Sequence, residues 1–81
     1  MNKPWKNPVI LALGEDGGDV TIDTTEAASW AMIEDWPTED GPALDRALLV
    51  CAAVQAGKKT DEDARQAFIA AAVEAGIAMK K

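Results

Sequence analysis

Apolar and polar positions alternate in the first part of the chain in the way that β-strands require. Residues 9–13 form an apolar run of strand length directly after Pro8. Val20 and Ile22 then alternate with polar residues, which is typical of a strand with one buried face. Three glycines within residues 14–18 suit the tight connection of two antiparallel strands. The pattern predicts a β-hairpin over the first 23 residues, opened by a loose leader at residues 1–7 that carries Trp5.

A first helix is predicted immediately after the hairpin. Asp23 and Glu26 have the spacing of a capping box, in which an N-cap side chain and an acidic side chain three residues later satisfy free backbone N–H groups. The apolar positions that follow extend this helix over about residues 24–34. Pro37 disfavours helical geometry at Trp36, so the helix is expected to end by that point.

Two longer helices are expected in the second half of the chain. One runs from Pro42, which suits the first helical position, to about residue 56, and Gly57 is a good stop signal. It is apolar nearly all round, which predicts that it is the central helix, buried on most sides. The next helix begins after the hydroxyl N-cap Thr60, with acidic residues in its first turn where the helix dipole favours them, and ends at Gly76.

The order of these segments defines the fold class. Strands come first and helices follow, which indicates an α+β domain in which an N-terminal β-hairpin packs against three helices. Residues 77–79 alternate between large and small apolar side chains and are a candidate for a short third strand at the C-terminal end. A chain of 81 residues is long enough for one domain and too short for two. Residues 1–81 are therefore expected to form a single domain with a fraying tail at residues 80–81.

The charge of the chain narrows its range of partners. Fourteen acidic and eight basic side chains give a net charge of −6, and the basic residues are scattered along the sequence. Proteins that bind nucleic acids or anionic membranes owe much of their affinity to clustered Lys and Arg side chains. Neither kind of partner is therefore expected. No apolar run approaches the ~20 residues that a membrane span needs. Cys51 is the only cysteine, which excludes an intramolecular disulfide and fits a cytoplasmic protein.

The sequence lacks the residues that most enzymes and metal sites require. There is no histidine, which is the commonest general base and metal ligand. Cys51 alone cannot form a zinc site, and its place among the apolar positions of the second helix indicates a small buried side chain. The glycine-rich segment at residues 14–18 has neither the ligand spacing of a calcium loop nor the lysine of a phosphate loop. We therefore expect no enzymatic activity, no cofactor and no metal.

Several short motifs, taken together, resemble a known family. The residues concerned are Pro8, Val9, Glu26, Ala27, Ala28, Trp36, Pro37, Gly41, Ala47, Cys51, Ala64, Arg65, Phe68, Ala71, Ala72, Ala75, Gly76 and Ile77. Their order and spacing, over nearly the whole chain, resemble a short bacterial family known only as a domain of unknown function, numbered nine hundred and eighty-two. Trp30 and Met32 depart from its pattern, since smaller or plain aliphatic residues are expected there. The resemblance implies the fold and the cellular setting, and it brings no activity with it.

The first predicted helix carries apolar residues on two faces. Three alanines and Met32 share one side at helical spacing, whereas Trp30 and Ile33 fall on the opposite side. With the alanine side inward, Trp30 and Ile33 stay near the surface, and Trp is enriched at protein interfaces. The first hypothesis is therefore a protein-interaction or regulatory module that uses these two residues, with a homodimer as one form of it. In the alternative arrangement Trp30 covers the hairpin.

A second hypothesis is a small-molecule-binding or enzymatic domain. Trp36 and Arg65 would form its pocket beside the acidic residues at positions 35–40, because ligand sites combine apolar walls with a few convergent polar groups. If Arg65 has a structural role instead, Asp61, one turn earlier on the same helix, is its expected partner. A third hypothesis, resting on charge alone, is an acidic surface that imitates nucleic acid and occupies a basic partner.

Overall fold

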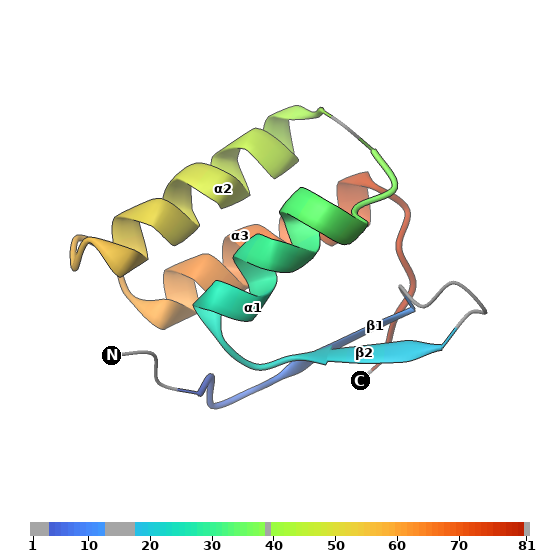
Figure 1. Cartoon of the computed structure of the whole chain (residues 1–81), viewed down its shortest axis with the longest axis horizontal. Coiled ribbons are helices and arrows are strands. Elements are labelled where there is room, and N and C mark those ends of the chain that lie inside the picture. Colours follow the sequence, from blue (N-terminus) through green and yellow to red (C-terminus); the bar gives the residue numbers. More distant parts are fainter. Residues whose placement is uncertain (1–3, 13–17, 39, 81) are drawn as a thin grey trace.

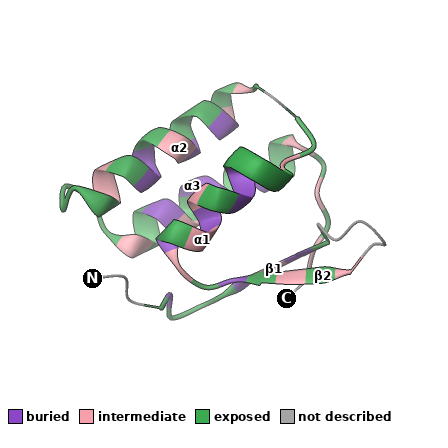
Figure 2. Ribbon diagram, viewed as in Figure 1, coloured by how far each residue is buried: buried purple, intermediate pink, exposed green. Residues whose placement is uncertain are grey.

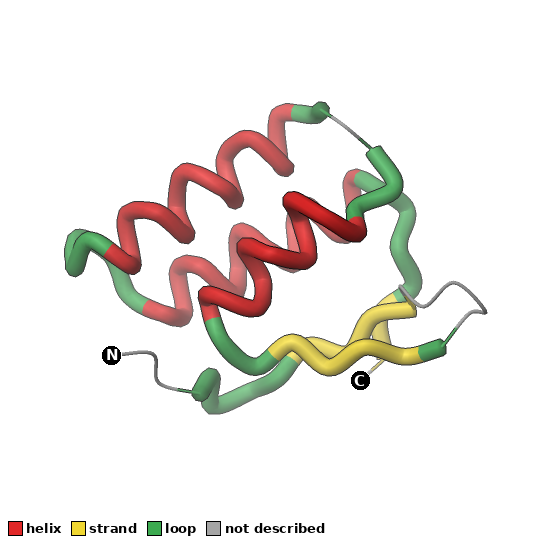
Figure 3. Tube along the Cα trace, in the orientation of Figure 1, coloured by secondary structure: helices red, strands yellow, loops and turns green. Residues whose placement is uncertain are grey.

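A small antiparallel sheet opens the fold. The computed structural model describes residues 4–12, 18–38 and 40–80 of the chain. Strands β1 (Val9–Ala12) and β2 (Asp19–Ile22) pair antiparallel, with Val9 opposite Ile22. The predicted hairpin is thus confirmed, while residues 14–17 of the turn predicted at residues 14–18 lie outside the described residues. A two-residue segment, β3 (Met79–Lys80), pairs antiparallel with the other edge of β1 and gives the order β2-β1-β3 (Figure 3).

One face of this sheet packs on the helices. Val9, Leu11 and Ile22 are buried, whereas Ala12 and Thr21, which alternate with them, are exposed (Figure 2). This is the two-residue period of strands with a single buried face.

Thr24 is the N-cap of the first helix. Its hydroxyl accepts a hydrogen bond of 2.9 Å from the backbone N–H of Ala27. The prediction of Asp23 as the N-cap is wrong by one residue. With Thr24 at the cap, Thr25 points into the core, where its hydroxyl accepts a hydrogen bond from the indole of Trp5. The first residue of the helix, Thr25, is therefore a buried position that joins the helix to Trp5.

The first helix changes its pitch halfway along. It begins as α1 (Thr25–Trp30) and continues into a π-helical turn, η1 (Ala31–Asp35). The backbone becomes extended at Trp36, ahead of Pro37, where the sequence predicted the end of the helix. π-Helical turns are rare and occur frequently at functional sites, which directs attention to the residues of η1.

Helix α2 (Pro42–Gln55) is capped by a distant side chain. Its N-cap is Gly41, which has no side chain to accept hydrogen bonds. The two carboxylate oxygens of Glu74 do so instead, each at 3.1 Å, from the backbone N–H groups of Ala43 and Leu44. Gly41 has a φ of +152°, and a Cβ added there would collide with the Glu74 carboxylate. Glycine at this position thus lets the end of one helix cap the start of another.

Helix α3 (Asp61–Glu74) begins with the N-cap that the sequence predicted. The hydroxyl of Thr60 accepts a hydrogen bond from the backbone N–H of Asp63, and the Asp63 carboxylate accepts one from the backbone N–H of Thr60. The pair forms a capping box. The backbone hydrogen bond from Thr60 is the main reason why the pKa of Asp63 lies below its usual value.

The central helix is α3, not α2 as predicted. Figure 1 shows α2 on the side of the other helices that faces away from the sheet, and α2 exposes Leu49 and Ala52 to solvent. The buried residues of α3 are Ala64, Ala67, Phe68, Ala71 and Ala72. Small side chains let a helix approach its neighbours closely, so an alanine-rich stripe suits a central position. The apolar character of α2 on all sides therefore reflects an exposed apolar face rather than full burial.

Trp5 lies in the core rather than in a loose leader. Its side chain is 5% exposed, and its backbone N–H donates a hydrogen bond to the carbonyl of Asp23. The indole packs edge-on against the fully buried Phe68, with ring centroids 6.0 Å apart. Trp36 packs against the same ring at 5.4 Å. One phenyl ring thus joins the N-terminal segment to the loop that follows η1.

Candidate interaction surface

The first helix buries its small residues and exposes its largest one. Ala28, Ala31 and Met32 are buried, so the alanine side faces inward. Trp30 is 54% exposed and Ile33 62% exposed, on the outward side of α1 and η1. The structure therefore has the arrangement in which the sequence leaves Trp30 and Ile33 at the surface, and Trp30 does not cover the hairpin.

Acidic side chains flank these two residues. Glu34 and Asp35, in the same π-helical turn, are both exposed. We refer to Trp30, Ile33, Glu34 and Asp35 as the Trp30 surface. Residues 7–45 of the sequence contain ten of the 14 acidic residues and none of the eight basic ones. The basic residues are therefore segregated rather than scattered, and this signal was present in the sequence.

Two other helices also expose a large apolar side chain. Leu49 on α2 is 73% exposed, and Val73 on α3 is 64% exposed. Neither has the combination found on the first helix, where an aromatic and an aliphatic residue stand three positions apart beside two carboxylates. Surface apolar residues that occur singly are normal, so these two define no site by themselves.

A hollow of about 260 Å³ lies between α2 and α3. Its apolar lining comes from Ala43 and Val50 of α2 and from Ala67 and Ala70 of α3. Its polar lining comes from Arg46, Lys59, Asp63 and Gln66. We call it the α2–α3 hollow. Sequence patterns did not indicate it, since it requires two helices to meet at a particular register.

A second hollow, of about 430 Å³, lies where the N-terminal segment meets the start of α3. It is lined by Pro4, Trp5, Lys6, Asn7, Thr60, Asp61 and Glu62. A relay of hydrogen bonds lies beside it: the indole N–H of Trp5 donates to the Thr25 hydroxyl at 3.1 Å, and that hydroxyl donates to Asp61 at 3.0 Å. The relay fixes the wall of this hollow by joining the N-terminal segment, α1 and α3.

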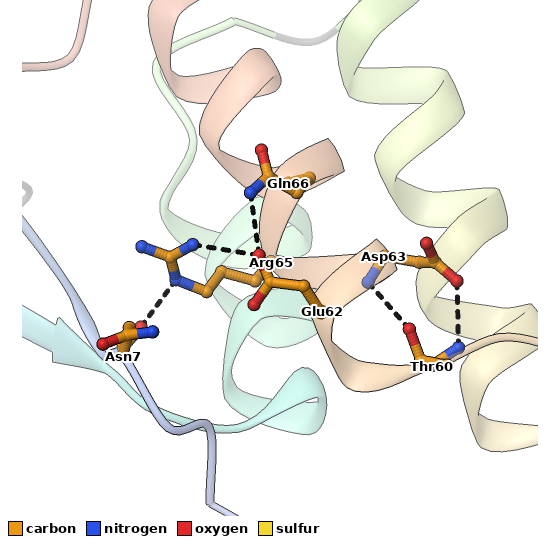
Figure 4. Close-up of polar contacts among 6 residues, drawn as sticks. All are labelled: Asn7, Thr60, Glu62, Asp63, Arg65 and Gln66. Carbon is orange, nitrogen blue, oxygen red and sulfur yellow. Dashed lines mark hydrogen bonds and ion pairs between the residues drawn. The ribbon is translucent and has the colours of Figure 1, made fainter.

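Arg65 has a structural role in this same region. Its Nε–H donates a 2.7 Å hydrogen bond to the carbonyl of Asn7, and its guanidinium lies 3.2 Å from the Glu62 carboxylate (Figure 4). Gln66 donates to the same carboxylate at 2.7 Å. The expected partner Asp61 is wrong, because its carboxylate instead accepts the hydrogen bond from Thr25.

Trp36 and Arg65, the residues of the second hypothesis, have different partners. Trp36 is half-buried against Phe68, and its indole N–H is buried without a hydrogen-bond partner among the described residues. Neither residue lines the two hollows described above. Of the acidic residues near Trp36, Asp35 and Asp40 are exposed, and Glu39 lies outside the described residues.

Cys51 is fully buried, and burial raises the pKa of its thiol to about 11. We expect Ellman's reagent to label the native protein slowly, through unfolding, and the denatured protein much faster, because the buried thiol is out of reach of the reagent and its raised pKa keeps it protonated. The unfolded thiol loses its proton at a lower pH than the native thiol. The contribution of this thiol to the free energy of unfolding should therefore be fully present below pH about 9.0 and be lost as the pH rises toward about 11. Rapid stoichiometric labelling of the folded protein at neutral pH would contradict this.

The described residues, 4–12, 18–38 and 40–80, contain neither a metal-ligand cluster nor a membrane-spanning helix. Within them, no group of three or more Cys, Asp and Glu side chains is placed to hold a metal ion. In the same part of the chain, no helix has the length and apolarity to cross a membrane.

The chain belongs to the family described as protein of unknown function (DUF982), whose family model matches residues 7–79. The resemblance inferred from the sequence is therefore confirmed, and the match includes the Trp30 surface and the α2–α3 hollow. Comparison with curated proteins and with solved structures found no match. The family fixes the class of the chain and assigns it no activity.

Proposed function

We propose that this chain is a small, non-catalytic protein-interaction module that contacts its partner through the Trp30 surface. The observation that carries the proposal is the exposure of Trp30 and Ile33 on a helix whose inward face is built from alanines and Met32. Trp30 leaves more than half of its surface in water in the monomer, and an interface would bury that apolar area. At an interface, a buried Trp is commonly among the few residues whose truncation costs about 2 kcal/mol or more of binding energy.

The charge around Trp30 supports a partner with basic residues at its rim. Glu34 and Asp35 lie beside the apolar pair, within a sequence stretch that has no Lys or Arg from residue 7 to residue 45. Complementary charge speeds the encounter of two proteins and excludes partners of like charge. Binding through this surface should therefore weaken as the salt concentration rises. Dissolved ions screen the attraction between exposed charges, over a Debye length of about 10 Å at 0.1 M salt.

Site-specific photo-crosslinking tests this proposal. A photoreactive amino acid at position 33, with Trp30 intact, is expected to give discrete protein adducts in cells that contain the protein. The same probe in a Trp30→Ala background should lose them, because the anchor of the interface is gone. A probe at the exposed Thr21, on the sheet face away from the helices, is the matched control.

Two outcomes would overturn the proposal. One is the same set of adducts from position 21 as from position 33, which would mean that capture does not depend on this surface. The other is an unchanged adduct pattern from position 33 when Trp30 is replaced by Ala.

A further inference from the structure

We propose that the partner of the Trp30 surface is a second copy of this chain, and that Trp30 of one copy enters the α2–α3 hollow of the next. This rests on the proposed function, because it names the occupant of the same surface. It assigns a binding role to the α2–α3 hollow and predicts head-to-tail association.

The size and lining of the hollow suit a single large side chain. Its volume of about 260 Å³ lies below the range of about 300–1,000 Å³ that is typical of small-molecule pockets. Its apolar residues, Ala43, Val50, Ala67 and Ala70, have short side chains, so an incoming ring can approach both helices closely. An indole places a large apolar area into such a pocket and loses little conformational freedom in doing so.

The charges at the two surfaces are complementary. Arg46 and Lys59 line the hollow, and neither forms a salt bridge with a carboxylate in the part of the chain that the structure describes. Asp63 also lines the hollow, where its carboxylate accepts the hydrogen bond from Thr60 and interacts electrostatically with Lys59, so the charged residues of the lining carry a net charge of about +1 (two cations and one carboxylate). Docking Trp30 there would bring Glu34 and Asp35 of one copy toward the two cations of the other. A symmetric contact of the Trp30 surface with itself would instead place carboxylates against carboxylates, which is destabilising.

The two surfaces belong to different parts of the molecule. The hollow is lined by α2, α3 and Lys59 and by no residue of α1 or η1, which carry Trp30. Each copy therefore has one donor surface and one acceptor surface, which is the arrangement of a heterologous contact. Since one Trp and its neighbours bury less than the roughly 1,200 Å² of a stable interface, association should be weak and visible only at high protein concentration.

Sedimentation equilibrium of the purified full chain, up to millimolar concentration, tests the inference. The wild type is expected to self-associate. Trp30→Ala removes the donor side chain, and the double change Arg46→Glu with Lys59→Glu reverses the two positive charges that line the acceptor hollow. Each of these variants should weaken association by about 30-fold or more. An equimolar mixture of the two variants should form a 1:1 complex, because one intact donor and one intact acceptor remain.

Matched variants separate the effect of the charges that line the hollow from the effect of the overall net charge. Lys58→Glu with Lys6→Glu changes the net charge by the same amount as the acceptor variant, at two exposed positions that do not line the hollow, so it should associate like the wild type at equal ionic strength. Ala70→Trp, at an exposed position, fills the hollow from within and should abolish association, and it provides a second acceptor variant.

Three results would overturn the inference. A wild type that stays monomeric at millimolar concentration removes the second copy as partner. A mixture of the donor and acceptor variants that stays monomeric shows that the Trp30 surface does not bind the hollow, and an acceptor variant that associates as strongly as the wild type points to a symmetric contact instead. Equal loss of association in the Lys6/Lys58 variant and in the Arg46/Lys59 variant would show that net charge alone is responsible. In each case, Trp30-dependent adducts to another protein from position 33 would leave the proposed function standing.

Discussion

Phe68→Ala is expected to lower the free energy of unfolding by about 3–5 kcal/mol. The ring of Phe68 is fully buried and lies in contact with both Trp5 and Trp36. Its removal leaves a cavity that its alanine neighbours on α3 cannot fill, since an alanine has no side-chain torsion to turn into it. A domain of this length has a total stability of roughly 4–12 kcal/mol. The variant should therefore lie close to the limit of folding.

Urea denaturation followed by far-UV circular dichroism measures this loss. Phe68→Leu keeps most of the volume and is expected to cost less than about 1.5 kcal/mol, so it reports on the same position if the alanine variant does not fold. Val73→Ala, an exposed truncation on the same helix, is the control and should change stability by no more than about 0.5 kcal/mol. An unfolding midpoint for Phe68→Ala equal to that of the wild type would show that Phe68 does not hold the core together.

The elements that the sequence predicted well are those fixed by local chemistry. Thr60 starts α3 through hydrogen bonds to residues three positions away. Gly57 and Gly76 follow the ends of α2 and α3 with φ values of +79° and +74°, which residues with a Cβ rarely adopt. The hairpin follows from two alternating segments close together in the chain. None of these features needs knowledge of a distant residue.

The features that the sequence did not predict depend on partners far along the chain. Asp23, Thr24 and Thr25 can all cap a helix, and the choice of Thr24 reflects the need for the Thr25 hydroxyl beside Trp5, 20 residues away. The cap of α2 is Glu74, about 30 residues from the helix start. A pattern of residue types along the chain does not show which distant residues come into contact.

One part of the candidate site could likewise be predicted from local sequence, and another part could not. The place of Trp30 and Ile33 on the same side of the helix was predicted, because it follows from helical spacing alone. Which side faces outward was left open by the sequence, because it depends on what the helix packs against. The α2–α3 hollow was not, because it exists only where Val50 of one helix and Ala67 of another approach at the right register. Likewise, a half-buried Trp36 against Phe68 could not be told from a pocket wall by its position beside Pro37.

Thr25→Val is expected to lower the free energy of unfolding by about 1–3 kcal/mol, although the two side chains have nearly the same shape. The Thr25 hydroxyl accepts a hydrogen bond from the buried indole N–H of Trp5 and donates one to Asp61. Valine leaves the indole N–H buried with no acceptor and the carboxylate without its donor. Leaving a buried donor unsatisfied costs more than the hydrogen bond itself contributes.

Three threonine variants isolate this effect under urea denaturation. Thr25→Ser keeps the hydroxyl and should restore most of the lost stability, whereas Thr21→Val makes the same chemical change on an exposed strand and should be close to neutral. Because the relay joins the N-terminal segment to α1 and α3, Thr25→Val should also increase acrylamide quenching of Trp fluorescence in the native state, measured in a Trp30→Ala background that lacks the exposed indole. If Thr25→Val is as stable as the wild type, the position of Trp5 is determined by its packing on Phe68. The hydrogen bonds of the relay then form as a result of that packing and do not stabilise it.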